Sequence, residues 1–260
     1  MTTETHQAII LNVPFTDAVA PPDFREMAPQ GIESAEGTPE IEQKIATDGD
    51  PRNAVAAWEG VPGSIEVYGA WTESTERWVM FVPRESTDGK KKYNKITFIK
   101  DLSHPDEPVQ IRRKLALGED SDSGAPLMRR EIYNTEEELP AVITDSGGDP
   151  SVDYPVSPHM RRDRVERLVV DRETGHVLSI TGDYCYPTEG TGDPLYQCEI
   201  EFKGIVGEHE ATIEGVMESV DRVSSRFSDF LASQNLTPQP TDLSKSKYIE
   251  SLARTEGIIS

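Results

Sequence analysis

Charged and uncharged residues alternate along residues 39–45, and this stretch constrains the fold more than any other. Alternate side chains of a β-strand point to opposite faces, so Glu40, Glu42 and Lys44 share one face of a predicted strand. Two carboxylates and an ammonium on one face are costly to bury unless they bind something. The carboxylates suit a divalent metal ion, and the ammonium suits a phosphate.

The same pattern returns near the other end of the chain, where Glu199, Glu201 and Lys203 again share one face of a predicted strand. A single copy of such a short pattern can arise by chance. A second copy, again within a predicted strand, favours a common function for the two. Two interpretations stay open from the spacing alone. The faces either bind ligands, or they belong to half-exposed strands with solvated charges.

The composition limits the class of protein. The chain has 260 residues, 35% hydrophobic residues and a formal net charge of −21, which argues against nonspecific binding to DNA or to an anionic membrane. No run of 18 apolar residues predicts a membrane span, and residues 1–7 show no secretory signal. With two cysteines, no disulfide framework is expected, and a cytoplasmic protein is the simplest interpretation.

In chain order, residues 1–37 read as a tail, 38–253 as one domain, and 254–260 as a second tail. A short helix is predicted over 52–58, and a helix with one apolar face begins near 211. A mobile loop is predicted over 136–159. Turn signals separate strand-like segments at 65–71, 78–82, 93–100, 109–117, 128–133, 162–170, 177–181 and 197–203.

Several middle segments also place charges on one face. Arg112 and Lys114 share a face, Arg129 shares one with Glu131, and nine of the 16 arginines lie between residues 112 and 172. A third set, Arg162, Arg164 and Glu166, lies opposite Val165 and Val169. Such a sheet is either an antiparallel sheet that faces water or a closed barrel with a polar lumen and an apolar outer face covered by helices.

In the barrel arrangement the chemistry follows from the side chains. The four carboxylates Glu40, Glu42, Glu199 and Glu201 would hold one or two hard cations, and arginines would grip phosphate oxygens in bidentate contacts. A metal ion that bridges phosphoryl oxygens, with cations that neutralise developing charge, is what phosphoryl transfer needs. Glu131 or Glu166 would orient water or the hydration shell of the metal.

These motifs resemble the CYTH superfamily, the triphosphate tunnel metalloenzymes. The resemblance spans about residues 38–253 and includes the final segment from Ser244 to Ile249, Ser-Lys-Ser-Lys-Tyr-Ile. It implies a mainly β (α+β) fold: an eight-stranded antiparallel barrel or tunnel with a polar lumen and flanking helices. It also implies a triphosphate substrate and Mg²⁺ or Mn²⁺. Members of the superfamily include inorganic and thiamine triphosphatases, RNA triphosphatases, class IV adenylate cyclases and polyphosphate polymerases.

The resemblance assigns roles to individual residues. The carboxylates Glu40, Glu42, Glu199 and Glu201 are the expected metal ligands, and Glu131 and Glu166 are the expected catalytic residues. On the strand near 93–100, Lys100 and Lys95 are both candidates, and Lys95 shares the face of Thr97. The full expected phosphate-binding set is Lys44, Arg84, Lys95, Lys100, Arg112, Lys114, Arg129, Arg162, Arg164 and Lys203. We expect hydrolysis of a triphosphate; the alternatives are nucleotide cyclisation, removal of an RNA 5′-triphosphate, and a noncatalytic module that binds polyphosphate or nucleotide.

Overall fold

The computed structural model describes residues 20–26, 39–84, 91–116, 127–190 and 192–260, with the backbone alone at 39, 114–116 and 127–131. The described strands are β1 (Arg25–Glu26), β2 (Pro39–Ala46), β3 (Ile65–Arg84), β4 (Lys92–Asp101), β5 (Gln110–Ala116), β6 (Leu127–Asn134), β7 (Met160–Asp171), β8 (His176–Pro187), β9 (Leu195–Ile205) and β10 (Gln239–Pro240). The helices are α1 (Arg52–Ala57), the short 3₁₀ helix η1 (Glu136–Glu138), α2 (Leu139–Asp145), α3 (Ile213–Ser233) and α4 (Lys245–Thr255).

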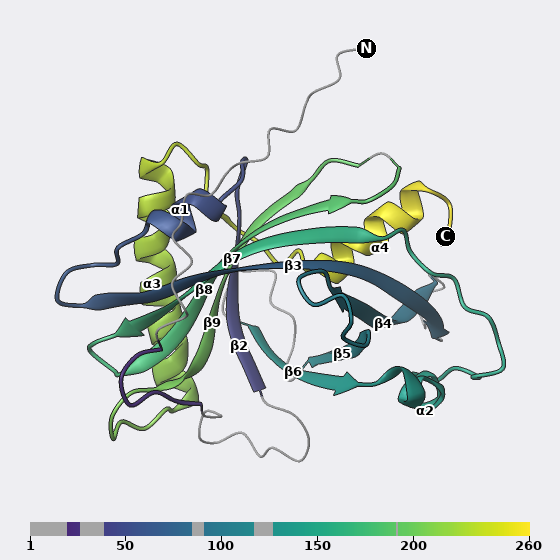
Figure 1. Ribbon diagram of the computed structural model, residues 1–260, viewed down its shortest axis with the longest axis horizontal. Helices are drawn as coiled ribbons and strands as arrows, with labels where there is room; N and C mark the ends of the chain where they lie inside the picture. Colours follow the sequence, from purple (N-terminus) through teal and green to yellow (C-terminus); the bar gives the residue numbers. More distant parts are fainter. Residues whose placement is uncertain (1–19, 27–38, 85–90, 117–126, 191) are drawn as a thin grey trace, which may run out of the picture.

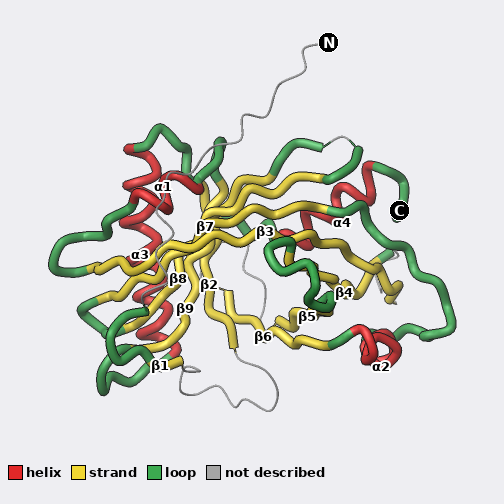
Figure 2. The backbone as a smooth tube through the Cα atoms, in the orientation of Figure 1, coloured by secondary structure: helices red, strands yellow, loops and turns green. Residues whose placement is uncertain are grey.

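All pairings between the described strands are antiparallel, which confirms the expectation of a mainly antiparallel β fold. The strand order is β1-β9-β8-β7-β3-β4-β5-β6-β2-β10 (Figures 1 and 2). In addition, β2 pairs with β9, where Glu42 lies opposite Glu201 and Lys44 opposite Glu199. The two glutamate-lysine motifs, more than 150 residues apart in sequence, are therefore neighbours on one face of the sheet.

The strand β3 differs most from its prediction. The segments 65–71 and 78–82, predicted as two strands, form one strand of 20 residues. Its pairing with β7 shifts between Tyr68 and Trp71, at Gly69, whose φ of 52° suits glycine. Such a bulge inserts one extra residue and reverses which residues face each side. Ile65 therefore packs in the hydrophobic core, whereas Arg77, also odd-numbered, lies on the charged face.

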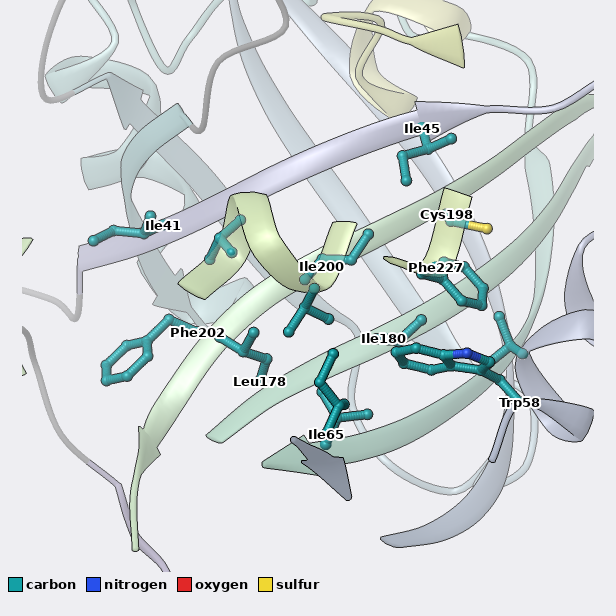
Figure 3. Packing of buried hydrophobic residues seen from close by; sticks show 14 of the residues in the cluster. Ile41, Ile45, Trp58, Ile65, Leu178, Ile180, Cys198, Ile200, Phe202 and Phe227 are labelled. Atoms are coloured by element: carbon teal, nitrogen blue, oxygen red, sulfur yellow. The ribbon is translucent and has the colours of Figure 1, made fainter. Parts of the chain in front are cut away.

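The apolar face of β2, β7, β8 and β9 packs against α3 and α1. Along α3, the side chains at the predicted spacing Val216, Val220, Val223 and Phe227 are fully buried, which confirms the helix face expected from the sequence. Figure 3 shows Phe227 beside Trp58, which follows α1, in one cluster with Ile180 and Ile200 of the sheet. Val165 and Val169 belong to the same core, as strand alternation predicts.

The helix α4 lies at the other end of the sheet from α3 (Figure 1). Its residues Tyr248, Ile249 and Leu252 pack with Val79 and Phe81 of β3 and with Met160, Cys185 and Leu195. By alternation, these strand residues lie on the charged face, so α4 covers one end of that face. Ile259, 5% exposed, joins this cluster, so within the expected tail 254–260 this one side chain is buried, whereas residues 254–257 are exposed.

Two other segments also carry structure that the sequence did not predict. Within the predicted mobile loop 136–159, η1 and α2 form, and Val142 and Ile143 of α2 are buried against Val82 and Phe98. In the predicted N-terminal tail, β1 pairs with the last residues of β9. Among the described helices, none is long and apolar enough to cross a membrane.

Candidate functional site

The charged face lines a cavity of about 500 Å³. Its walls come from seven strands, β2–β5, β6, β7 and β9, and from the start of α4. Ten of the residues predicted from the sequence line it: Glu40, Lys44, Arg84, Lys95, Arg112, Arg162, Arg164, Glu199, Glu201 and Lys203. Strand alternation places all of them except Arg84, the last residue of β3, on one face, and pairing between distant strands brings them to one cavity.

Lys44 lies between two of the predicted carboxylates. Its Nζ forms an ion pair with Glu42 and lies 3.4 Å from Glu199 Oε1. The side chains of Glu42 and Lys44 are 1% and 2% exposed, so solvent screens this contact little. Burial of a charge requires a partner, and the two glutamates supply it.

Asp183 of β8 connects the charged face to α4. Its carboxylate accepts hydrogen bonds from Arg164 Nε (2.7 Å) and lies 2.8 Å from Lys245 Nζ. Burial raises the pKa of Asp183, but Arg164, Lys245 and Arg162 outweigh it and hold the pKa well below its usual range. Lys245 Nζ also lies 2.7 Å from Glu199 Oε1, and Arg164 Nη2 donates to Glu199 Oε2 (2.9 Å). Acids and bases therefore alternate through this part of the site.

Arg77 of β3 is in a different situation. It is 4% exposed, and within the described residues its one hydrogen bond runs from Nε to Thr75 Oγ1 (3.3 Å), with no ion pair. Burial lowers the pKa of Arg77 well below its usual value, and nearby Arg162, Arg112 and Arg164 lower it further. An arginine stays protonated in proteins, so this shift expresses the cost of holding a buried cation that the charge of Glu73 offsets only in part.

Arg162 lies beside Arg77 and shares its hydroxyl partner. Arg162 Nε donates to Thr75 Oγ1 (3.2 Å), and its Nη2 forms an ion pair with Glu73. Burial raises the pKa of Glu73, but Arg162, Arg164 and Arg77 together lower it below its usual value. One glutamate thus stands among three arginines, and the local charge stays positive. This end of the cavity has the electrostatics of an anion site.

Glu166 and Lys203 lie next to one another on the charged face. Burial raises the pKa of Glu166, although Arg164, whose Nη1 is 3.7 Å from Glu166 Oε2, acts in the opposite direction. Burial lowers the pKa of Lys203, but Glu201, 2.7 Å from its Nζ, and Glu166 raise it above the usual value. A buried carboxyl with a raised pKa is suited to proton transfer with water.

The four predicted metal ligands have the right chemistry but not the arrangement of a metal site. Glu42 and Glu201 are directly opposite one another across β2 and β9, and carboxylate oxygens are the ligands that Mg²⁺ and Mn²⁺ prefer. In the described part of the chain, however, no three acidic, His or Cys side chains are placed to hold a metal ion. Three of these carboxylates each contact a different lysine. The pairs are Glu42 with Lys44, Glu199 with Lys245, and Glu201 with Lys203. A metal would require Lys44 to leave Glu42.

The remaining predicted residues are placed differently. Lys100, by alternation, lies on the face of β4 opposite Lys95 and Thr97, away from the described lining of the cavity. The backbones of Lys114, Arg129 and Glu131 are described, but their side chains lie outside the described part of the structure. In register, Lys114 is opposite Glu131, and Arg129 is opposite Glu40. Of the two candidates on β4, Lys95 is therefore the one at the cavity.

Four of the charged residues described above were not predicted: Glu73, Arg77, Asp183 and Lys245. Asp183 was missed because the strand was predicted to end at residue 181, whereas β8 continues to Pro187. Lys245 had a weak signal, since it lies in the final Ser-Lys-Ser-Lys segment. Glu73 and Arg77 fell in the gap between two predicted strands, and the bulge at Gly69 hides their alternation with the start of β3.

Comparisons with known proteins find likeness only among solved structures. No protein-family model and no curated protein matches the chain. Among solved structures, the S. pombe Pct1 RNA triphosphatase is similar at 14% identity and a TM-score of 0.26, over 76% of this chain and 83% of that chain. At that TM-score the likeness says nothing about the function of this chain.

Proposed function

We propose that the protein binds a triphosphate group inside a tunnel formed by β2 to β9 and hydrolyses it with Mg²⁺ or Mn²⁺. The tunnel is supported by the strand pairings. Following them from β9 through β8, β7, β3, β4, β5 and β6 leads to β2, and β2 pairs with β9 again. The polar cavity lies on the face that this circuit would enclose, and α3 packs on the other face.

The observation that carries the proposal is Arg77. A buried cation without an ion pair, beside Arg112 and Arg162, costs free energy unless an anion occupies the space before it. Guanidinium groups offer paired donors that match phosphate oxygens, and a chain of phosphates presents several charges in a row. A triphosphate therefore satisfies this part of the cavity better than a single small anion does.

The carboxylates at the other part of the site have the chemistry for a metal ion, and lysines contact three of them in this structure. Glu40, Glu42, Glu199 and Glu201 would hold it, with Lys44 moving from Glu42 toward the phosphates. Bound there, the metal would neutralise charge on the phosphate oxygens. The protein's own contribution is to hold the phosphates between Arg77, Arg162 and Lys95, and Glu166 would accept a proton from the attacking water.

A phosphate-release screen tests this function. Tripolyphosphate, nucleoside triphosphates, thiamine triphosphate and triphosphate-ended RNA are each incubated with the protein in Mg²⁺, in Mn²⁺ and in EDTA. We expect orthophosphate from at least one substrate, with metal only. Release of pyrophosphate from a nucleotide would indicate cyclisation instead. Tight binding of triphosphate without any turnover would make the protein a noncatalytic binding module.

A further inference from the structure

The cavity wall contains an aromatic side chain that the triphosphate chemistry does not use. Tyr133 of β6 lines the cavity and is 55% exposed. Among the described residues, the other large hydrophobic side chains with comparable exposure are Val152 and Val156, so no other aromatic ring is as open. Exposed aromatic surface gains little for the fold, and on a polar cavity wall it is surface available to a ligand.

The position of Tyr133 ties it to the arginines. It lies directly opposite Arg112 of β5, and Arg112 lies opposite Thr97 of β4. Side chains of directly opposed residues start about 4.5–5.5 Å apart on the same face of a sheet. Arg112 is also one of the three arginines whose charge acts on Arg77. A ligand with its phosphates at Arg77 and Arg112 would therefore have its next group within reach of the Tyr133 ring.

We infer that Tyr133 is a stacking platform for the aromatic base of a nucleoside triphosphate. This inference rests on the proposed triphosphate function and narrows its substrate class. A flat ring stacks on a nucleobase without regard to base identity, whereas an inorganic triphosphate has no group that would contact it. A cavity of about 500 Å³ is in the usual size range of pockets for organic ligands, and exceeds what three phosphate groups fill.

Stacking far from the reacting phosphorus stabilises the bound substrate and the transition state equally, so it acts on KM and not on kcat. The experiment compares steady-state hydrolysis of ATP and of tripolyphosphate by the wild type, Tyr133→Ala, Tyr133→Phe and Tyr186→Ala. Tyr186 is a half-buried tyrosine on the opposite face of β8 from Asp183, with its ring centroid 4.8 Å from that of Tyr184, and serves as the matched control.

We expect Tyr133→Ala to raise KM for ATP about 5- to 100-fold, with kcat within about twofold. Its kinetics with tripolyphosphate should stay within about twofold of the wild type. Tyr133→Phe, which keeps the ring, and Tyr186→Ala should behave as the wild type with both substrates. The melting temperature of Tyr133→Ala should change little, because the ring is exposed.

Three results would overturn the inference. Hydrolysis of tripolyphosphate but not of ATP by the wild type would remove the base subsite and leave the triphosphatase function standing. Equal loss for both substrates in Tyr133→Ala, or loss in Tyr133→Phe, would show that the residue does not act by stacking. No hydrolysis of either substrate by the wild type would remove the proposed function and the inference together.

Discussion

Two groups of basic side chains line the same cavity and differ in how their charges are balanced. Lys44, Arg164 and Lys245 each contact at least two carboxylates. Arg77, equally buried, contacts a hydroxyl and lies near three further arginines, Arg162, Arg112 and Arg164. Burial acts on both groups in the same direction, yet acids hold the pKa of Arg164 well above its usual value, whereas that of Arg77 lies well below it.

This difference predicts which side chains of the site stabilise the fold and which bind a ligand. In the balanced group, each charge is already satisfied by the fold, so its removal should disturb the protein itself. Around Arg77, the proposed function makes the ligand the missing partner, so removal of Arg77 should weaken binding and leave the fold intact. The following substitutions test that separation.

The largest expected effect is on turnover, through the carboxylates that contact the lysines of the site. If Glu42 and Glu201 serve a metal as well as the lysines, Glu42→Gln and Glu201→Gln should each abolish metal-dependent phosphate release. The fold should survive with some loss of stability, because each substitution removes one carboxylate partner of a lysine, while Lys44 keeps Glu199 and Lys203 keeps Glu166 nearby. Phosphate release and Mn²⁺ binding, followed by electron paramagnetic resonance, give independent readouts. Wild-type turnover in both variants would make these carboxylates purely structural.

Asp183 should carry the largest effect on stability. It is fully buried between Arg164 and Lys245, so Asp183→Asn leaves two buried cations short of a partner. We expect a loss of about 3–5 kcal/mol in the free energy of unfolding, measured by urea denaturation. Asp163→Asn is the matched control, since Asp163 lies on the opposite face from Arg164 and bonds Ser74 and Arg161. It should lose at most about 1 kcal/mol; equal losses in the two variants would remove the special role of Asp183.

Lys44 belongs to the balanced group by its contacts and to the ligand site by its place in the motif. We expect Lys44→Ala to lower kcat/KM for a triphosphate by at least about tenfold while Mn²⁺ still binds, because a charge-assisted phosphate contact is lost. Steady-state kinetics and a melting curve are measured side by side. An unchanged kcat/KM with a lower melting temperature would assign Lys44 to structure alone.

The smallest effect is a pH dependence of stability. The pKa of Asp183 is depressed in the folded state, so its contribution is present above the unfolded pKa of about 3.9 and is lost as pH falls toward the folded value. A group that takes up one proton on unfolding changes the free energy of unfolding by at most about 1.4 kcal/mol per pH unit. Urea unfolding between pH 3 and 6 should show a steeper acid loss in the wild type than in Asp183→Asn. Parallel curves would contradict the ion-pair account.

The regular alternation of the strands made one part of this site predictable. Arg162 and Arg164 were expected on the opposite face from Val165, and the structure places them there, because a period of two holds along β7. The apolar spacing of α3 was readable for the same reason. The partnership of β2 with β9 could not be read from either motif, since it depends on strand order across the sheet.

The rest of the site depended on features without a local signal. Gly69 reverses the parity of β3, so Arg77 cannot be assigned to a face by counting from Ile65. Lys245 reaches Asp183 and Glu199 from a helix 46 or more residues away in the chain. On β4, Lys95 and Lys100 were both candidates, and the register with β3 and the cavity lining separate them.

The balance of charge around Arg77 makes the central claim measurable. Isothermal titration with tripolyphosphate compares the wild type, Arg77→Met and Arg254→Met, in which the control arginine is exposed on α4. We expect Arg77→Met to bind at least about tenfold more weakly than the wild type and to melt, without ligand, at the same or a higher temperature, because an uncompensated buried cation is gone. Arg254→Met should bind as the wild type. Unchanged affinity together with a lower melting temperature in Arg77→Met would contradict the account.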